Sequence, residues 1–463
     1  MKTLLISVGL ALGLIVIGAP PRTVDAQAAD AFGFGYAQRA TDGSWVLNVI
    51  DPAGEIAVKP LPLSIEGVLL DVAASPDGQW LMLYSVHQYE STIHVVNLLT
   101  GETQFVDRGR YYDDSTSEEF PRWSPDSQYL AYTNVFVESD VSDAYVYDVA
   151  EKSRSLVWGG YTPTYPYEVA WSPDGTQLAL LVRRCTWQEG VIKDCGSSIE
   201  RFSIPITVEE PAVFPYPQPL PRAILTYEYG RPCGLTWSPD GAFIAFRSSC
   251  GFVMSGVFNE VFMLDVAQST IQQVTYLTNP APLIDTIPLN YMNSYDFAWS
   301  ADNQLLAGIV RALGIAVIDP VTFSAGSFAY PHPFVTPMSI STSVAREWAR
   351  NPVDGMLAYR AEATQLNAEN GLYDANRQTK IATYQTGTLT EIAAGTPGCD
   401  YRWSPDGAHL MYRGVSATTP GVACSMSNTF VLYQSASSSF STYAVDDYVW
   451  PAGWVVLPDS PQS

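Results

Sequence analysis

One short motif recurs seven times along this chain and limits the possible folds more than any other feature. A residue that is usually tryptophan precedes Ser-Pro-Asp-Gly or a close variant, at spacings between 48 and 66 residues. Proline presets φ, aspartate caps its own turn and glycine accepts positive φ, so each copy predicts a tight turn between two strands. The copies begin at Ala74, Trp123, Trp171, Trp237, Trp299, Arg350 and Trp403.

Strand-like segments surround every copy of the motif. An apolar strand follows each turn, as at 177–182 and 243–247, and a second follows later, as at 93–97. This pattern predicts an all-β propeller of four-stranded blades, with strands A to D in chain order and the motif joining A to B.

The two ends of the chain carry extra strand-like segments. Segments 32–37 and 45–50 precede the first motif, and 448–453 follows the last. We expect these to form one further blade, giving eight blades, with seven as the alternative. Pairing of the N- and C-terminal strands would then close the propeller and remove exposed sheet edges.

The repeat resembles the TolB-like, WD40-like family of propeller repeats, whose consensus is a Trp-Ser-Pro-Asp-Gly turn before an apolar strand. Ala74 in place of tryptophan and the extra Val353 depart from that consensus. Prolyl-oligopeptidase-like relatives add a Gly-x-Ser-x-Gly elbow, which this sequence lacks. TolB itself carries a separate domain before its propeller, so its partner role is not carried over.

The first 28 residues have the pattern of a signal peptide. Lys2 precedes an apolar run, and Ala26-Gln27-Ala28 is a small-x-small cleavage pattern. We therefore expect a signal peptide at 1–28, a propeller at 29–463 and a secreted or periplasmic protein. No stretch has the length and apolarity of a membrane span, and we expect a monomer.

The charge balance limits the partners. The formal net charge is −23, so nucleic acid is excluded as a partner because phosphate binding needs a basic face. Cationic ligands, metal ions or basic proteins fit this charge better.

An even number of cysteines in an exported chain favours disulfides. The chain has six, and the simplest pairing is local. Two of these pairs would link strands A and B of one blade at equivalent positions. The expected pairs are Cys185 with Cys195, Cys233 with Cys250, and Cys399 with Cys424.

Long connections are expected on one face of the propeller. The A-to-B and C-to-D turns are short, whereas the other connections include 183–200, 276–295 and 361–376. Long loops on a rigid scaffold often carry binding residues. We therefore expect the functional face at the B-to-C and D-to-A connections.

The third residue before the motif tryptophan, position −3, is acidic in most copies. Alternation along the strand predicts that these side chains face the propeller axis, together with the small residue just before the tryptophan. The candidate ligand-binding residues are Asp71, Glu168, Asp296, Glu347, Asp400 and, with the last copy aligned on Trp450, Asp447.

These carboxylates allow two interpretations. Like charges about 8 Å apart at an effective dielectric near 20 repel by about 2 kcal/mol, which a bound cation would relieve. Calcium suits such hard oxygen ligands best. Alternatively, each carboxylate caps backbone N–H groups at a strand start. The candidate calcium ligands are Asp296, Glu347, Asp400, Asp447 and Asp71.

The pattern as a whole predicts a binding scaffold for an extracytoplasmic protein, peptide or glycan. Two alternatives remain at this point. One is a hydrolase or lyase that uses the axial carboxylates with a divalent cation. The other is a structural subunit of an envelope or secreted assembly. The motif aspartates are predicted to be turn residues only.

Overall fold

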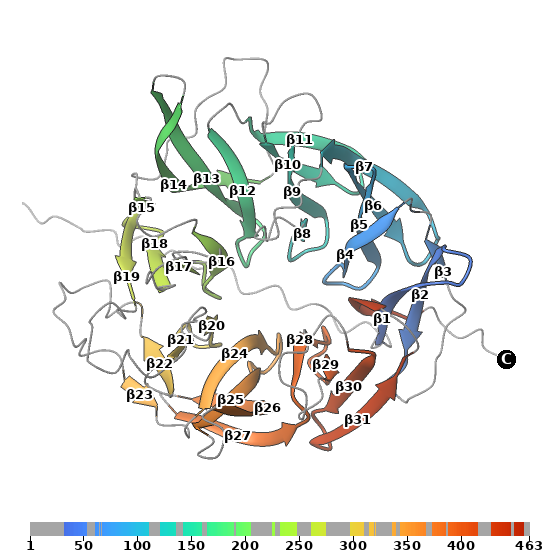
Figure 1. Cartoon of the computed structure of the whole chain (residues 1–463), viewed down its shortest axis with the longest axis vertical. Helices are drawn as coiled ribbons and strands as arrows, with labels where there is room; N and C mark the ends of the chain where they lie inside the picture. The colour runs from blue at the N-terminus through green and yellow to red at the C-terminus, as the bar shows by residue number, and fades with distance from the viewer. Residues whose placement is uncertain are drawn as a thin grey trace, which may run out of the picture. The chain divides into compact units, whose positions relative to one another are not determined.

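A computed structural model shows the chain as an all-β propeller (Figure 1). The structure describes residues 32–457 apart from 53–60, 64, 66, 111–120, 136–141, 160–163, 189–190, 205–224, 227–231, 248–260, 275–296, 310–313, 319, 321–335, 339–342, 367–372, 386–387, 415–426 and 446–448. The predicted signal peptide lies outside the described residues. Within them, no helix is long and apolar enough to cross a membrane.

The described strands form eight four-stranded sheets, as the eight-blade prediction requires. Sheets 1 to 4 contain β4 (Val68–Ala74), β5 (Trp80–His87), β6 (Glu90–Asn97) and β7 (Thr103–Arg110); β8 (Arg122–Trp123), β9 (Tyr129–Val135), β10 (Ser142–Asp148) and β11 (Ser153–Trp158); β12 (Thr164–Trp171), β13 (Gln177–Gln188), β14 (Val191–Ser203) and β15 (Leu225–Thr226); β16 (Cys233–Trp237), β17 (Phe243–Arg247), β18 (Val261–Asp265) and β19 (Thr270–Gln273).

Three further sheets continue the series, and the eighth joins both ends of the chain. Sheets 5 to 8 contain β20 (Phe297–Trp299), β21 (Leu305–Ile309), β22 (Gly314–Ile318) and β23 (Thr336–Met338); β24 (Ser343–Arg350), β25 (Leu357–Leu366), β26 (Tyr373–Gln385) and β27 (Thr388–Gly395); β28 (Gly398–Trp403), β29 (His409–Gly414), β30 (Thr429–Gln434) and β31 (Ser439–Ala444); β1 (Phe32–Arg39), β2 (Trp45–Ile50), β3 (Leu61–Leu63) and β32 (Val449–Val456).

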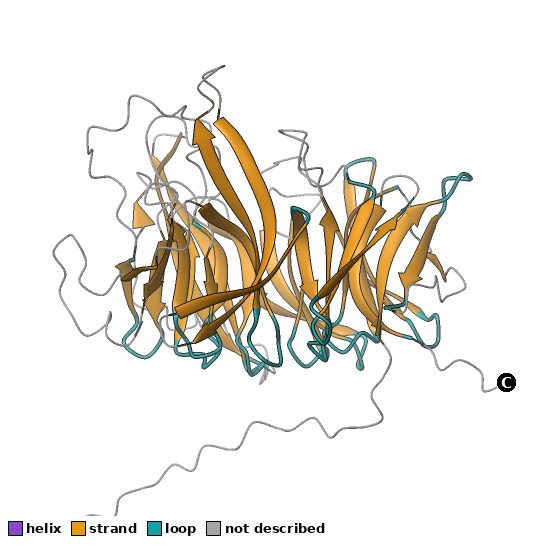
Figure 2. Cartoon of the chain, turned by 90° about the horizontal axis from the view of Figure 1, so that it is seen from below, coloured by secondary structure: helices purple, strands orange, loops and turns teal. Residues whose placement is uncertain are grey.

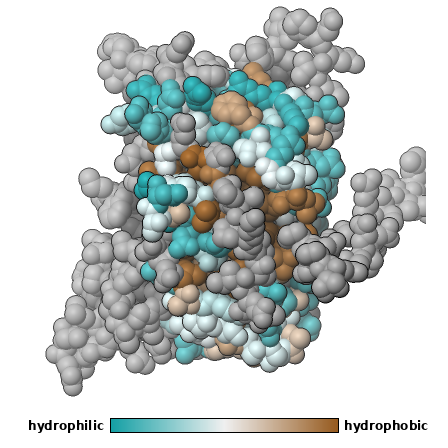
Figure 3. Space-filling model, turned by 90° about the vertical axis from the view of Figure 1, so that its right-hand side faces the viewer, coloured by the Kyte–Doolittle hydropathy of each residue, from teal (hydrophilic) through white to brown (hydrophobic). Residues whose placement is uncertain are grey.

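The terminal sheet, sheet 8, has the order β3-β2-β1-β32. β1 and β32 run antiparallel, with Phe34 opposite Trp454. The pairing predicted between the N- and C-terminal strands is therefore present. Figure 3 views the side of the molecule on which β2 and β3 lie in Figure 1, and hydrophobic residues gather there between hydrophilic ones.

The motif turns are held by the predicted turn chemistry. In the first copy Ser75 Oγ donates to Asp77 Oδ1 at 2.5 Å, the same oxygen accepts from the backbone N–H of Gln79 at 3.0 Å, and Gly78 has a φ of 71°. Equivalent serine and aspartate pairs recur at 124/126, 172/174, 238/240, 300/302 and 404/406. The prediction that these aspartates are turn residues is confirmed.

The motif tryptophans connect each sheet to the one before it. Trp237 Nε1 donates to the backbone carbonyl of Ala170 at 3.1 Å. The acceptor is always the residue just before the equivalent tryptophan position of the preceding sheet. The same bond, at 2.8 to 3.3 Å, joins Trp123 to Ala73, Trp171 to Arg122, Trp299 to Thr236, Trp403 to Ala349 and Trp454 to Arg402.

This series of bonds corrects the alignment of the eighth copy. The sequence aligned that copy on Trp450, but Trp454 makes the indole bond. Position −3 of the terminal sheet is therefore Pro451, four residues after the expected Asp447. The strand carries two tryptophans and no Ser-Pro-Asp-Gly turn, so the sequence offered no signal to choose between them.

The predicted long loops at 183–200 and 361–376 are mostly strand. β13 and β14 are 12 and 13 residues long, and β25 and β26 are 10 and 13. Both are B-to-C hairpins, and β13–β14 extends past the neighbouring strands (Figure 1). Figure 2 shows the tight turns on one face and the longest strands rising from the other. The segment 276–295 lies outside the described residues.

Candidate functional site

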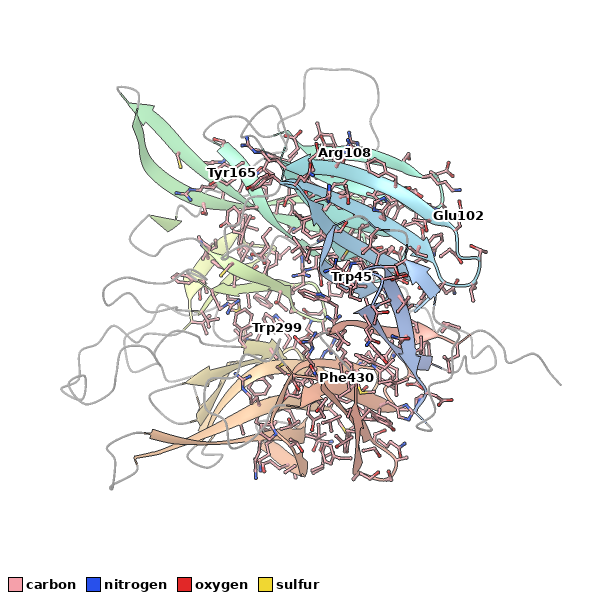
Figure 4. The ribbon with its side chains drawn as sticks, turned by 45° about the vertical axis from the view of Figure 1, so that its right-hand side comes forward. Trp45, Glu102, Arg108, Tyr165, Trp299 and Phe430 are labelled. Carbon is pink, nitrogen blue, oxygen red and sulfur yellow. The ribbon has the colours of Figure 1, made fainter. Side chains whose placement is uncertain are left out.

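The candidate site lies on the inner strands of the propeller, where strand A of each sheet presents positions −3 and −1. The residue at position −2 packs between sheets, as predicted: Val72 is fully buried and Val169 and Leu235 are buried. Position −1 is at least partly exposed in most sheets. Figure 4 shows the contrast between an inner strand, where Trp299 lies, and the outer turn at Glu102.

Glu168 is a cap and not a free ligand. It is buried, and its two carboxylate oxygens accept the backbone N–H groups of Gly234 at 3.0 Å and Leu235 at 2.7 Å. Both donors belong to β16, the first strand of the next sheet. For this residue the structure favours the strand-start interpretation over the ligand-binding one.

Asp400 pairs with an arginine from the neighbouring strand. Its Oδ2 lies 3.4 Å from Arg413 Nε, and the side chain of Arg413 is only 2% exposed. Arg413 also donates to the backbone carbonyl of Val449 in β32. This arginine therefore compensates Asp400 and connects sheet 7 to the terminal sheet.

A bulge explains why Asp400 departs from simple alternation. The pairing of β28 with β29 jumps from Cys399 to Arg402, and Asp400 has a φ of 56°. β16 has the same jump at Gly234, whose φ is 72°. A bulge turns a side chain out of the regular pleat, which sequence alternation cannot anticipate.

Asp71 is the half-buried carboxylate of the site. Burial raises its pKa, and Asp400 also raises it, while the nearby Arg402 and Arg122 lower it. These two arginines stand at position −1, where the sequence analysis expected small residues. Both arginines were missed because only position −3, where the acidic residues lie, was considered. They are visible in the sequence as the two exceptions to the small residues at position −1.

Three further predicted ligands are Asp296, Glu347 and Asp447. Asp296 and Asp447 lie outside the described residues, and the side chain of Glu347 is not described although its backbone belongs to β24. Among the described residues no group of three or more His, Cys, Asp or Glu side chains is placed to hold a metal ion. Calcium binding therefore stays a prediction.

Three of the six cysteines can be described. Cys185, Cys233 and Cys399 are disulfide-bonded, and the described part of the chain holds no free cysteine. Cys233 and Cys399 stand at equivalent places, opposite Arg247 and Arg413. Since the expected partners Cys250 and Cys424 lie outside the described residues, their pairing stays a prediction.

Comparison with known proteins gives the fold a context. No family model and no curated protein matches the chain. Similar solved structures include a prolyl endopeptidase, with 12% identity over 82% of this chain and 50% of that one and a TM-score of 0.46. Oligogalacturonate lyase in complex with manganese has 11% identity over 90% of this chain and 85% of that one, with a TM-score of 0.46. TolB from Acinetobacter baumannii has 17% identity over 62% of this chain and 60% of that one, with a TM-score of 0.31. The chain spans about half of the prolyl endopeptidase, and these likenesses concern the propeller fold alone.

Proposed function

We propose that this chain is an exported propeller scaffold that binds a protein, peptide or glycan on the face carrying the B-to-C hairpins. The observation that carries the proposal is the difference between the two faces. One has uniform, internally hydrogen-bonded turns, and the other has the hairpins β13–β14 and β25–β26. Elaboration of one face of a rigid scaffold is typical of a binding surface.

A network of polar and aromatic contacts at the base of the β13–β14 hairpin connects it to sheet 2. Arg184 Nη2 bonds Glu200 Oε1, its Nε donates to Ser198 Oγ at 3.2 Å, and its guanidinium lies 5.3 Å from the ring centroid of Trp158 in sheet 2. Glu200 is 1% exposed. A projecting element fixed in this way loses little conformational entropy when a partner docks on it.

Export is part of the proposal. The expected signal peptide at 1–28 and the disulfide-bonded cysteines both suit an oxidising, extracytoplasmic compartment. N-terminal sequencing of the protein from its source should find a mature start near Ala29. An intact Met1 would contradict it.

Binding can be tested with printed glycan and peptide arrays, using the disulfide-bonded full chain. A variant in which residues 186–193 are replaced by Asn-Gly should lose the ligands that the wild type captures, since the hairpin then ends near the other strands. Lys152→Gln, in an exposed pair with Glu102 at the outer turns, is the matched control on the opposite face. Equal capture by the shortened and the wild-type chains would refute this face as the binding surface.

A further inference from the structure

Two arginines break an otherwise regular pattern on the inner strands. Position −1 carries Arg122 in β8 and Arg402 in β28. In the other sheets the position is small, which leaves room beside the two long side chains. The small residues are Ala73, Ala170, Thr236, Ala298, Ala349 and Gly453.

The backbone of each arginine is fixed by a neighbouring indole. The carbonyl of Arg122 accepts from Trp171 Nε1 at 3.0 Å, and that of Arg402 accepts from Trp454 Nε1 at 2.8 Å. The Arg402 guanidinium lies along Gly453 of the next sheet, where a Cβ would be 3.8 Å from Nη1. The same Cβ would be 3.6 Å from the Cβ of Ala74, so the Arg402 guanidinium lies close to sheet 1.

Neither guanidinium has a direct partner in the described part of the chain. The ion pairs and side-chain hydrogen bonds found there do not involve Arg122 or Arg402. Both act electrostatically on Asp71 without pairing with it within 4 Å. In a chain with a net charge of −23, two arginines near one carboxylate, neither paired within the described residues, are unexpected.

We propose that Arg122, Arg402 and Asp71 form a binding site for a carboxylate group of the ligand. This proposal goes beyond the hairpin surface proposed above, because position −1 directly precedes the motif tryptophan and lies at the end of strand A that leads into the A-to-B turn. A guanidinium binds a carboxylate through two parallel N–H···O bonds. The acidic surface of the whole molecule disfavours polyanions, so a single carboxylate on a peptide or glycan fits better than nucleic acid or polyphosphate.

Asp71 makes the site pH-sensitive. Its pKa is raised by burial, opposed by Arg402 and Arg122, and raised further by Asp400. Once protonated, its O–H donates to the bound carboxylate, whereas the ionised form repels it. Binding therefore takes up a proton and weakens as the pH rises through the raised pKa of Asp71.

Calorimetric titration of the full chain with succinate tests the site, with neutral succinamide as the blank. Wild type should bind succinate saturably, and Arg122→Gln or Arg402→Gln should weaken binding at least about tenfold, since each removes charge-assisted hydrogen bonds to the carboxylate. Lys variants at these positions should bind with intermediate affinity because they keep the charge without the fork. Lys152→Gln should bind like the wild type.

The Asp71→Asn variant separates this site from a cation site. It should keep succinate binding and lose the pH dependence that Asp71 adds to the titration of succinate itself, since the amide donates a hydrogen bond at any pH. Four outcomes would each overturn the proposal. The wild type fails to bind succinate, or the arginine variants bind it equally well. Inorganic phosphate binds more tightly than succinate, or calcium raises the melting temperature and Asp71→Asn abolishes that rise.

The outcomes for the site and for the scaffold are distinct. Array capture that is lost on shortening the β13–β14 hairpin, with no succinate binding by the wild type, would leave the scaffold function standing and remove the carboxylate site. Succinate binding that is lost in Arg122→Gln and Arg402→Gln, without any array capture, would support the carboxylate site and remove the scaffold function.

Discussion

At the scale of single residues, departures from the repeated motif have physical reasons that can be identified. Ser127 and Asn303 replace the motif glycine, at φ values of 62° and 60°. Each accepts a backbone N–H from the turn of the preceding sheet, Asp77 and Asp240, at 3.0 Å. Each side chain thus gains a bond between sheets that glycine cannot make, which offsets the cost of positive φ in a residue with a Cβ.

The indole bonds provide the first stability prediction. Trp237→Phe removes the N–H that reaches Ala170 and should lower the free energy of unfolding by about 1 to 2 kcal/mol, measured by urea denaturation. Trp158→Phe is the matched control, because the buried Nε1 of Trp158 has no partner among the described residues. An equal loss in both variants would show that ring size, not the hydrogen bond, controls stability.

Asp71 gives a prediction about pH. Because its pKa is raised in the folded state, folded protein holds the proton more tightly than unfolded protein, and stability falls as the pH rises above about 4, the ordinary aspartate range. Asp71→Asn should therefore raise the melting temperature at pH 7 and make little difference near pH 3. Glu90→Gln changes the same charge at an exposed pair and serves as control. A lower melting temperature at pH 7 would contradict this prediction.

At the scale of strands and hairpins, the sequence predicted the tight turns, which depend on neighbouring residues. It did not predict the long hairpin strands, which depend on pairing between two segments. The Ser-Pro-Asp-Gly turns were predicted because four consecutive residues contain all their hydrogen-bonding groups. The extension of β13 and β14 was not, since residues 183–200 become strand only by pairing with each other. The residues of the proposed carboxylate site differ from this case, because all three can be read from the repeat: Asp71 was singled out at position −3, and Arg122 and Arg402 were overlooked at position −1.

The β13–β14 hairpin also bears on the cysteines. Arg184 pairs with Gly196 and Thr186 with Lys193, so the backbone of Cys185 faces the step from Asp194 to Cys195. Non-reducing peptide mapping should return this link together with 233–250 and 399–424. Replacing Cys185 and Cys195 by serine should cost about 2 to 3 kcal/mol. A link between distant sheets would refute local pairing.

At the scale of the whole molecule, a backbone hydrogen bond joins the terminal sheet to sheet 1, which lacks the motif tryptophan. Ala74 cannot make an indole bond, and the backbone takes its place: Val456 N–H donates to the carbonyl of Gly78 at 3.0 Å. A Cβ at Gly78 would lie 2.9 Å from Val456 N. Sheets 1 and 8 therefore meet backbone to backbone, and the glycine is required there.

Removing β32 should destabilise the entire propeller. A chain ending before Val449 leaves the β1 edge unpaired and uncovers Phe34, which packs edge-to-face on Trp454 at 5.6 Å. We expect loss of cooperative thermal unfolding and aggregation through the exposed edge. Deletion of residues 458–463 alone is the control. Cooperative melting of the chain without β32 would show that sheet 8 is dispensable.

The terminal sheet also determines the order in which the chain can mature. β1, β2 and β3 are made first, yet their fourth strand is synthesised last. In the nascent chain, the edge of β1 that pairs with β32 therefore stays open while sheets 1 to 7 are synthesised. Sheet 8 can therefore be completed only after the strands of sheets 1 to 7 have been synthesised, and any product that lacks β32 exposes the β1 edge.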